Sequence, residues 1–134
     1  MQKTYHGSCH CGAIRFEARL DLAQGTGRCN CSFCAKARWW GVQIKPDAFR
    51  LLAGEGHLRD YQFASHSVQH LFCGICGVRS FGRGHIEQAG GDFVSINLAC
   101  LDDIEPQALA EAPVRFMNGR DNDWWHAPAE TRHL

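Results

Sequence analysis

The sequence has no long hydrophobic run, no block of like charge and no internal repeat, and each absence excludes a class of protein. No stretch approaches the roughly 18 consecutive apolar residues that a transmembrane helix needs. The 14 Lys and Arg residues balance the 14 Asp and Glu residues, which argues against an electrostatic surface for nucleic acid. The opening MQKTYHGS contains no apolar run, so we expect no secretory signal and a cytoplasmic protein. Without repeats or linkers, residues 1–134 are expected to form a single domain.

Cysteine, in contrast, is abundant: the chain has eight, and seven of them lie in three tight groups. The groups are CHC (Cys9, Cys11), CNCSFC (Cys29, Cys31, Cys34) and CGIC (Cys73, Cys76). A reducing compartment disfavours disulfides, and a bridge within Cys-x-Cys would be strained because successive strand side chains diverge. A chain of this length also buries a core without cysteine cross-links. We therefore interpret the three groups as metal ligands, with zinc as the expected metal.

Two of the groups together supply four sulfurs. Zinc binds about four ligands in a tetrahedral arrangement, and a Cys-x-x-Cys turn provides two of them. The glycine after each turn can adopt positive φ, which lets backbone amides point at the sulfurs. The simplest pairing predicts one closed structural zinc site made by Cys9, Cys11, Cys73 and Cys76.

The CNCSFC loop offers three sulfurs, an odd number. Catalytic zinc typically keeps three protein ligands and an open fourth position. Cys29, Cys31 and Cys34 are therefore candidate ligands of a second, catalytic zinc. Three alternatives stay open: a histidine closes the site, Cys100 closes it, or a single zinc binds with different pairing. Iron–sulfur ligation fits the spacing less well, and Cys100 itself is expected to be a small buried residue on a strand.

Alternation of apolar and polar residues runs through most of the chain and predicts short strands. The predicted strands are 13–18, 39–44, 49–52, 58–63, 69–73 and 92–99, and the glycine-rich pieces QGTG, GEGH, GRGH and GGD are predicted turns. One helix is expected in 101–113, capped by Asp102 or Asp103, and a turn or two of helix after Cys31. Trp124 and Trp125 are expected to pack the C-terminal piece against the body. The predicted fold class is mostly β.

Three motifs in one order, GSCHCGAIRFEA, CNCSFCAK and HLFCGICGVRSFGR, resemble the glutathione-dependent formaldehyde-activating enzyme family. The resemblance covers about residues 7–103 and is closest to the branch that includes centromere protein V. It implies a compact zinc-bound β fold of several small antiparallel sheets, shared with a Rab exchange-factor accessory protein. It also implies two zinc ions per chain, of which the second can be lost. In the family the structural and catalytic sites correspond to the four-cysteine and three-cysteine sets named above.

The activity that the resemblance implies is formation of S-hydroxymethylglutathione from glutathione and formaldehyde, a carbon–sulfur lyase reaction run in reverse. We expect coordination to deprotonate the glutathione thiol, which then attacks formaldehyde. Lys36, Arg38 and Trp39 are candidate substrate-binding residues, since the two cations could bind the carboxylates of the tripeptide. Trp39 and Trp40 depart from the small residues that we associate with the enzyme branch at this point.

Two other functions fit the same residues. In one, both zinc ions only stabilise a non-catalytic binding or scaffold module. In the other, Cys29 and Cys31 carry out redox chemistry when zinc is lost. The sequence pattern does not determine the oligomeric state.

Overall fold

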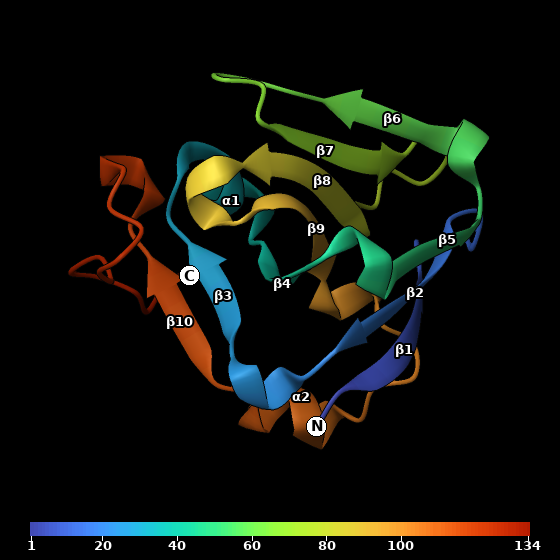
Figure 1. Ribbon diagram of the computed structural model, residues 1–134, viewed down its shortest axis with the longest axis horizontal. Coiled ribbons are helices and arrows are strands. Elements are labelled where there is room, and N and C mark those ends of the chain that lie inside the picture. Colours follow the sequence, from blue (N-terminus) through green and yellow to red (C-terminus); the bar gives the residue numbers. More distant parts are fainter.

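The computed structural model describes all 134 residues, Met1–Leu134, and the chain forms two β-sheets (Figure 1). The smaller sheet has the order β1-β2-β5, with β1 at Lys3–Ser8, β2 at Arg15–Leu20 and β5 at Phe49–Ala53. The larger has the order β10-β3-β4-β9-β8-β7-β6. Its strands are β3 (Thr26–Cys29), β4 (Trp40–Ile44), β6 (Leu58–Tyr61), β7 (Val68–Cys73), β8 (Phe81–Ile86), β9 (Gly91–Asn97) and β10 (Val114–Met117). The mostly β fold expected from the sequence is confirmed.

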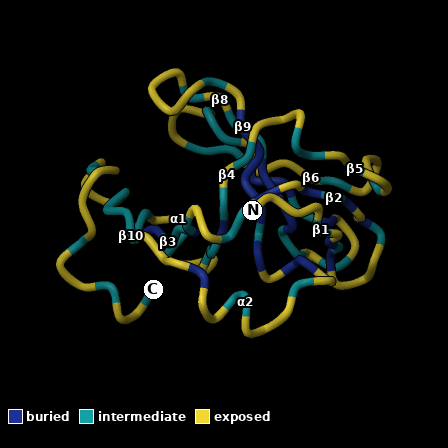
Figure 2. Tube along the Cα trace, turned by 60° about the horizontal axis from the view of Figure 1, so that its bottom comes forward, coloured by how far each residue is buried: buried dark blue, intermediate teal, exposed yellow.

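The hydrophobic core joins the two sheets. Phe16 of β2 and Phe81 of β8 are both 0% exposed, and their ring centroids lie 6.0 Å apart. Phe49 of β5 contacts the same Phe81 ring at 4.6 Å. Figure 2 shows the buried segments gathered where β1, β2 and β9 approach one another. Burial of each such side chain contributes about 1.5–3 kcal/mol, and Cys9 and Cys73 belong to the same core.

Helices are few and short: α1 spans Ser32–Ala37 and α2 spans Pro106–Glu111, with six 3₁₀ turns along the chain. None is long and apolar enough to cross a membrane. The helix expected after Cys31 is confirmed as α1. The cap predicted for the second helix is wrong, since Glu105 occupies that position. Asp102 accepts a hydrogen bond from Ser8 instead, which ties the segment before α2 to β1.

One predicted turn is a strand. The piece GRGH lies within β8, and its glycines serve close packing rather than chain reversal. A Cβ at Gly82 would lie 2.8 Å from the backbone oxygen of Gln69, and one at Gly84 would lie 2.4 Å from the ring of Phe93. Because such short contacts do not occur in folded proteins, these two positions exclude side chains. The glycines of GRGH therefore mark close packing within a strand, and the turn predicted there is wrong.

Strands β1, β3 and β10 also lie outside the predicted set. β10 pairs in parallel with β3, from Val114 opposite Thr26 to Met117 opposite Cys29, whereas the other pairs are antiparallel. Parallel neighbours need a long connection, and here strands β4 to β9 all lie between β3 and β10 along the chain. The C-terminal strand therefore returns to the edge beside the CNCSFC loop.

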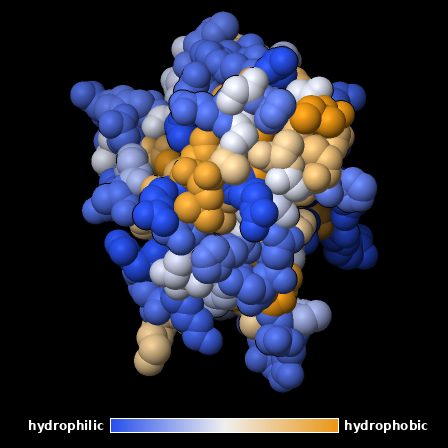
Figure 3. Space-filling view, turned by 90° about the vertical axis from the view of Figure 1, so that its right-hand side faces the viewer, coloured by the Kyte–Doolittle hydropathy of each residue, from blue (hydrophilic) through white to orange (hydrophobic).

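The surface carries only scattered apolar side chains. The face in Figure 3 is mainly hydrophilic, with small separated hydrophobic patches. Leu52 and Ile75 are 44% and 62% exposed. In the C-terminal piece Trp124 packs beside Gly119, but Trp125 is 80% exposed, so the prediction that both tryptophans pack against the body is wrong for Trp125.

Candidate functional site

The first cysteine cluster brings together the segment after β1 and the turn after β7. Cys9 and Cys11 follow β1, while Cys73 ends β7 and Cys76 lies in the next turn. The Cys9 and Cys11 sulfurs lie 3.7 Å apart, and those of Cys11 and Cys73 lie 3.8 Å apart. All four sulfurs lie within 4.8 Å of one another. The structure thus brings together the four residues that the sequence predicts as one set.

Two similar turns present these sulfurs. The Ile14 amide donates to Cys9 Sγ at 3.2 Å, and the Ile75 amide donates to Cys73 Sγ at 3.4 Å. Gly12 and Gly77 close the turns at φ +81° and +80°, a region that side chains disfavour. Hydrogen bonds from the backbone of Val78 and Cys11 lower the pKa of Cys76 to about 6. Four sulfurs with amide donors are the ligand set that structural zinc requires, so a zinc ion fits these residues.

The second cluster is built at the junction of β3 and α1. Cys29 ends β3, Cys31 is the N-cap of α1, and Cys34 lies in its first turns. The three sulfurs lie within 4.8 Å of one another. The Cys31 amide donates to Cys29 Sγ at 3.4 Å, and the Cys34 amide donates to Cys31 Sγ at 3.3 Å. The end of β3 and the first turn of α1 therefore bring the three sulfurs together.

No fourth histidine, cysteine or carboxylate joins this second cluster. Cys100 is buried elsewhere, with its sulfur beside the Asn97 side chain and the backbone oxygen of Arg79. Hydrogen bonds from the thiols of Cys29 and Cys34 hold the pKa of Cys31 far below its usual value, and hydrogen bonds with Cys29 and Cys31 raise the pKa of Cys34. The three sulfurs fit a zinc ion that keeps one position for another ligand.

The C-terminal segment covers this loop. The Asn30 side chain donates to Asn118 at 2.9 Å and accepts from the Arg120 amide at 3.0 Å. A Cβ on Gly119 would lie 2.6 Å from Cys29 Sγ and 2.7 Å from the Trp124 ring. Because Gly119 lacks a side chain, the segment after β10 can lie directly against the sulfur of Cys29.

Replacing Gly119 with alanine is expected to weaken metal binding at the second cluster about 10- to 100-fold, the usual effect of disturbing groups around metal ligands. The new methyl group must displace Cys29 Sγ or the Trp124 ring. Metal content per chain should fall from two toward one, with the first cluster still loaded. Gly56→Ala is the matched control, because nothing lies within 4 Å of a Cβ there. Full loading of Gly119→Ala in competition with a chelator would contradict the prediction.

An aromatic wall stands beside the second cluster. Phe33, which lies between Cys31 and Cys34, packs against His70 of β7 with ring centroids 4.1 Å apart. Phe63 stacks on His70 at 5.1 Å and on Phe33 at 5.7 Å. Burial, with a smaller contribution from the charge of Arg79, lowers the pKa of His70 to about 4. His70 is therefore a neutral, buried imidazole at neutral pH.

Arg79 completes this wall. Its guanidinium carbon lies 3.9 Å from the ring centroid of Trp39 and 5.1 Å from that of Phe33. Burial lowers the pKa of Arg79 to about 10, while the charges of Cys34 and Cys31 act in the opposite direction. The side chain remains a cation at neutral pH and is held over the rings of Trp39 and Phe33.

The three candidate substrate-binding residues differ in their surroundings. Trp39 packs on Arg79 beside the cluster, whereas Lys36 and Arg38 are exposed. Trp40 lies apart, where its indole N–H donates to Thr26 at 2.8 Å. Sequence reasoning missed Arg79 as a site residue. The only signal available was its place, three residues after Cys76.

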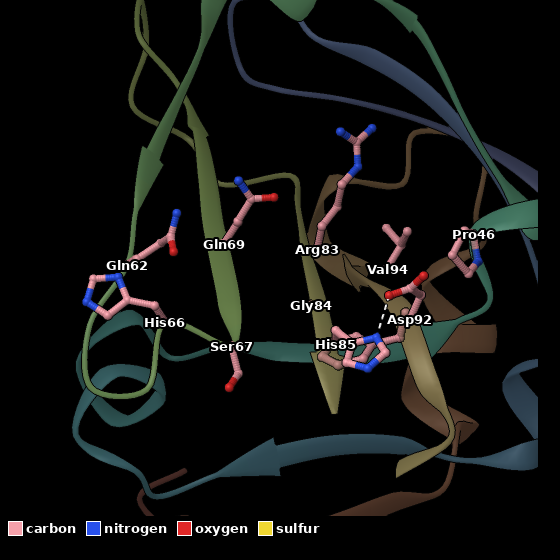
Figure 4. Close-up of a pocket in the computed structure, with 11 residues that line it drawn as sticks. Pro46, Gln62, His66, Ser67, Gln69, Arg83, Gly84, His85, Asp92 and Val94 are labelled. Carbon is pink, nitrogen blue, oxygen red and sulfur yellow. Dashed lines mark hydrogen bonds and ion pairs between the residues drawn. The ribbon is translucent and has the colours of Figure 1, made fainter. Parts of the chain in front are cut away.

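One cavity lies away from both cysteine clusters. It measures about 460 Å³ and is lined by polar groups of β7, β8 and β9, among them Gln69, Arg83 and His85 (Figure 4). Its His85 and Asp92 side chains meet at 2.6 Å. Because strand side chains alternate, Gln69 and Arg83 face away from His70. No cysteine lines this cavity, so it is separate from the candidate metal site.

These features define a β-sheet protein with one four-thiol and one three-thiol metal-binding cluster. A model of the family described as glutathione-dependent formaldehyde-activating enzyme matches residues 4–118. The chain belongs to this family. The match does not separate the branches of the family, so the centromere protein V branch stays a prediction.

Individual relatives agree with this assignment. The chain is 35% identical over 79 residues to a Halomonas elongata protein named as a putative glutathione-dependent formaldehyde-activating enzyme. That match covers 52% of this chain and 50% of the relative, so the chain spans about half the length of its curated relative. A crystal structure of a Rhodobacter sphaeroides protein is similar with a TM-score of 0.70 at 29% identity, covering 82% of this chain and 99% of that one.

Proposed function

We propose that the protein is a zinc-dependent enzyme that joins the thiol of glutathione to formaldehyde and forms S-hydroxymethylglutathione, the reverse of a carbon–sulfur lyase reaction. The observation that carries the proposal is the cluster of Cys29, Cys31 and Cys34 with no fourth protein ligand. Membership of the family supports the same reaction. Seven cysteines would hold two zinc ions, four in the first cluster and three in the second.

Different residues of the chain have different roles in this reaction. A zinc ion held by the second cluster would supply Lewis acidity and so lower the pKa of a thiol bound to it. Cys29, Cys31 and Cys34 hold the reacting centre at the N-terminus of α1, where amide hydrogen bonds orient two of the sulfurs. Phe33, with His70 against it, forms an apolar wall on one side. Such a wall excludes water and so strengthens electrostatic interactions with the reactants.

The test compares rates with and without the protein. Glutathione and formaldehyde are mixed with zinc-loaded protein, and formation of the adduct is followed against the spontaneous reaction. We expect acceleration in proportion to the protein concentration. If two zinc ions are bound per chain and the rate stays spontaneous, the proposal is wrong, and the scaffold function becomes the better explanation of the same metal sites.

A further inference from the structure

Several buried polar side-chain atoms have no hydrogen-bond partner. They include Nε and Nη1 of Arg79, Oγ of Ser95 and Nδ1 of His70. Ser95 is 7% exposed and His70 is 9% exposed. Leaving a buried polar group unpaired costs about 1–3 kcal/mol, and more for a charged one. A cost of this kind at several adjacent groups indicates a site that is completed by a ligand.

His70, Arg79 and Ser95 lie around Gly82 of the larger sheet. Gly82 lies opposite Ser95 in the pairing of β8 with β9, and the pairing of Gln69 with Arg83 places His70 opposite Gly82 on the other side. Residues directly opposite across strands share a face. Because Gly82 has no side chain, the polar groups around it can approach closely: a Cβ there would lie 3.0 Å from Arg79 Nη2 and 3.0 Å from Ser95 Oγ. The guanidinium of Arg79 and the hydroxyl of Ser95 therefore converge on one point of the sheet.

These polar groups lie on the side of the sheet that α1 covers. His70 packs against Phe33, which lies between two of the clustered cysteines. Arg79 is held over Phe33 and Trp39, and its guanidinium makes no ion pair with any carboxylate. Stacking on aromatic rings offsets part of the cost of burying the cation, but it fixes the guanidinium plane and leaves its N–H groups unused. A rigid, unpaired donor in a buried setting is the arrangement that stabilises developing negative charge.

We propose that Arg79, assisted by Ser95, binds the aldehyde oxygen during the reaction, and this inference rests on the proposed function. The thiolate sulfur attacks the carbonyl carbon and the S–C bond forms. The C=O π bond breaks, and its electron pair passes to the oxygen, where the N–H groups of Arg79 donate to the oxyanion. A proton from water then converts this oxygen to the hydroxyl group of the product.

The chemistry of the cluster gives a reason for such a residue. Three thiolate ligands place negative charge on a metal and weaken it as a Lewis acid toward a carbonyl oxygen. A separate cation beside the cluster can stabilise the oxygen instead. Lys36 and Arg38 are exposed to solvent, whereas Arg79 is the cation held against the cluster's own helix.

The kinetic test uses Arg79→Gln in the zinc-loaded protein. We expect kcat to fall about 100- to 1,000-fold, as when an oxyanion donor is removed, with the KM for glutathione within about threefold and metal content unchanged. Arg79→Lys should recover part of kcat. Arg83→Gln is the matched control, because this partly buried arginine of β8 faces the other side of the sheet and packs over Phe49 and Phe81.

Three results would overturn the inference. If Arg79→Gln raises the KM for glutathione but leaves the reaction of uncharged 2-mercaptoethanol unchanged, Arg79 binds a substrate carboxylate. If Arg79→Gln loses metal from the second cluster, its charge only balances the thiolates. If the rate is unchanged, Arg79 has no part in the reaction.

A binding measurement separates this inference from the proposed function. Titration calorimetry with formate, a small oxyanion, should show binding to the wild-type protein and to Arg83→Gln but at least tenfold weaker binding to Arg79→Gln. Equal binding by all three proteins would overturn the inference even if the enzyme is active. Formate binding can depend on Arg79 while the protein fails to accelerate the reaction of glutathione with formaldehyde. In that case the proposed reaction and the oxyanion role of Arg79 are both wrong, and Arg79 only forms an anion-binding site.

Discussion

Replacement of Cys73 with serine is expected to leave no folded protein at room temperature. Cys73 is 1% exposed, lies in the hydrophobic core and shares the four-sulfur cluster that joins β1 to β7. Structural zinc contributes about 10–16 kcal/mol to folding in small zinc domains, whereas the net stability of a domain is about 5–15 kcal/mol. A strong chelator should have the same effect on the wild-type protein. Circular dichroism together with metal content per chain measures both.

Cys100→Ser provides the control for this prediction. Cys100 is also buried, at 7% exposure, but it belongs to neither cluster. We expect this variant to remain folded with two metal ions and to lose only about 1–3 kcal/mol, the cost of placing a hydroxyl in an apolar setting. The prediction is wrong if Cys73→Ser, or the chelated wild-type protein, unfolds at the wild-type temperature.

Replacement of Cys31 with serine is expected to abolish activity while the fold and the first metal remain. Cys31 caps α1, and its sulfur accepts a hydrogen bond from the Cys34 amide at 3.3 Å. Serine is a favoured N-cap, so the helix should persist although a ligand is lost. We expect a rate decrease of more than about 100-fold, since even the residues around metal ligands contribute 10- to 100-fold. The measurement is adduct formation, with metal content per chain determined on the same sample.

The exposed Ser32 of α1 supplies the comparison for Cys31. Ser32→Ala changes the neighbouring residue of the same helix without removing a sulfur, so rate and metal content should stay at the wild-type values. A Cys31→Ser protein that binds two metal ions and keeps the wild-type rate would exclude the three-sulfur cluster as the reacting centre.

The sequence predicted the cysteine clusters better than it predicted the sheets. The spacing of Cys73 and Cys76 in a glycine-closed turn carries its own local signal, and the four sulfurs meet as expected. The strand pattern was clear in β2 because one face of that strand is buried. β3 and β10 gave no such pattern, since their pairing links residues 26–29 with 114–117 and depends on the whole fold.

The residues around the reacting centre were the hardest to predict. Arg79 has the sequence environment of an ordinary surface arginine, and its burial arises only when Trp39 and Phe33 pack on it. Gly82 was read as part of a turn, although its role depends on its cross-strand neighbour Ser95. Both properties come from tertiary contacts that no local pattern encodes.

The position of β10 has a consequence for the order in which the protein matures on the ribosome. The four-sulfur cluster is complete in sequence once Cys76 has been synthesised. The loop of Cys29 still lacks the contacts of Asn118 and Arg120 with Asn30, because both residues are synthesised after Cys76. A nascent chain can therefore capture one ion at the first cluster before the thiols of the second cluster acquire this cover.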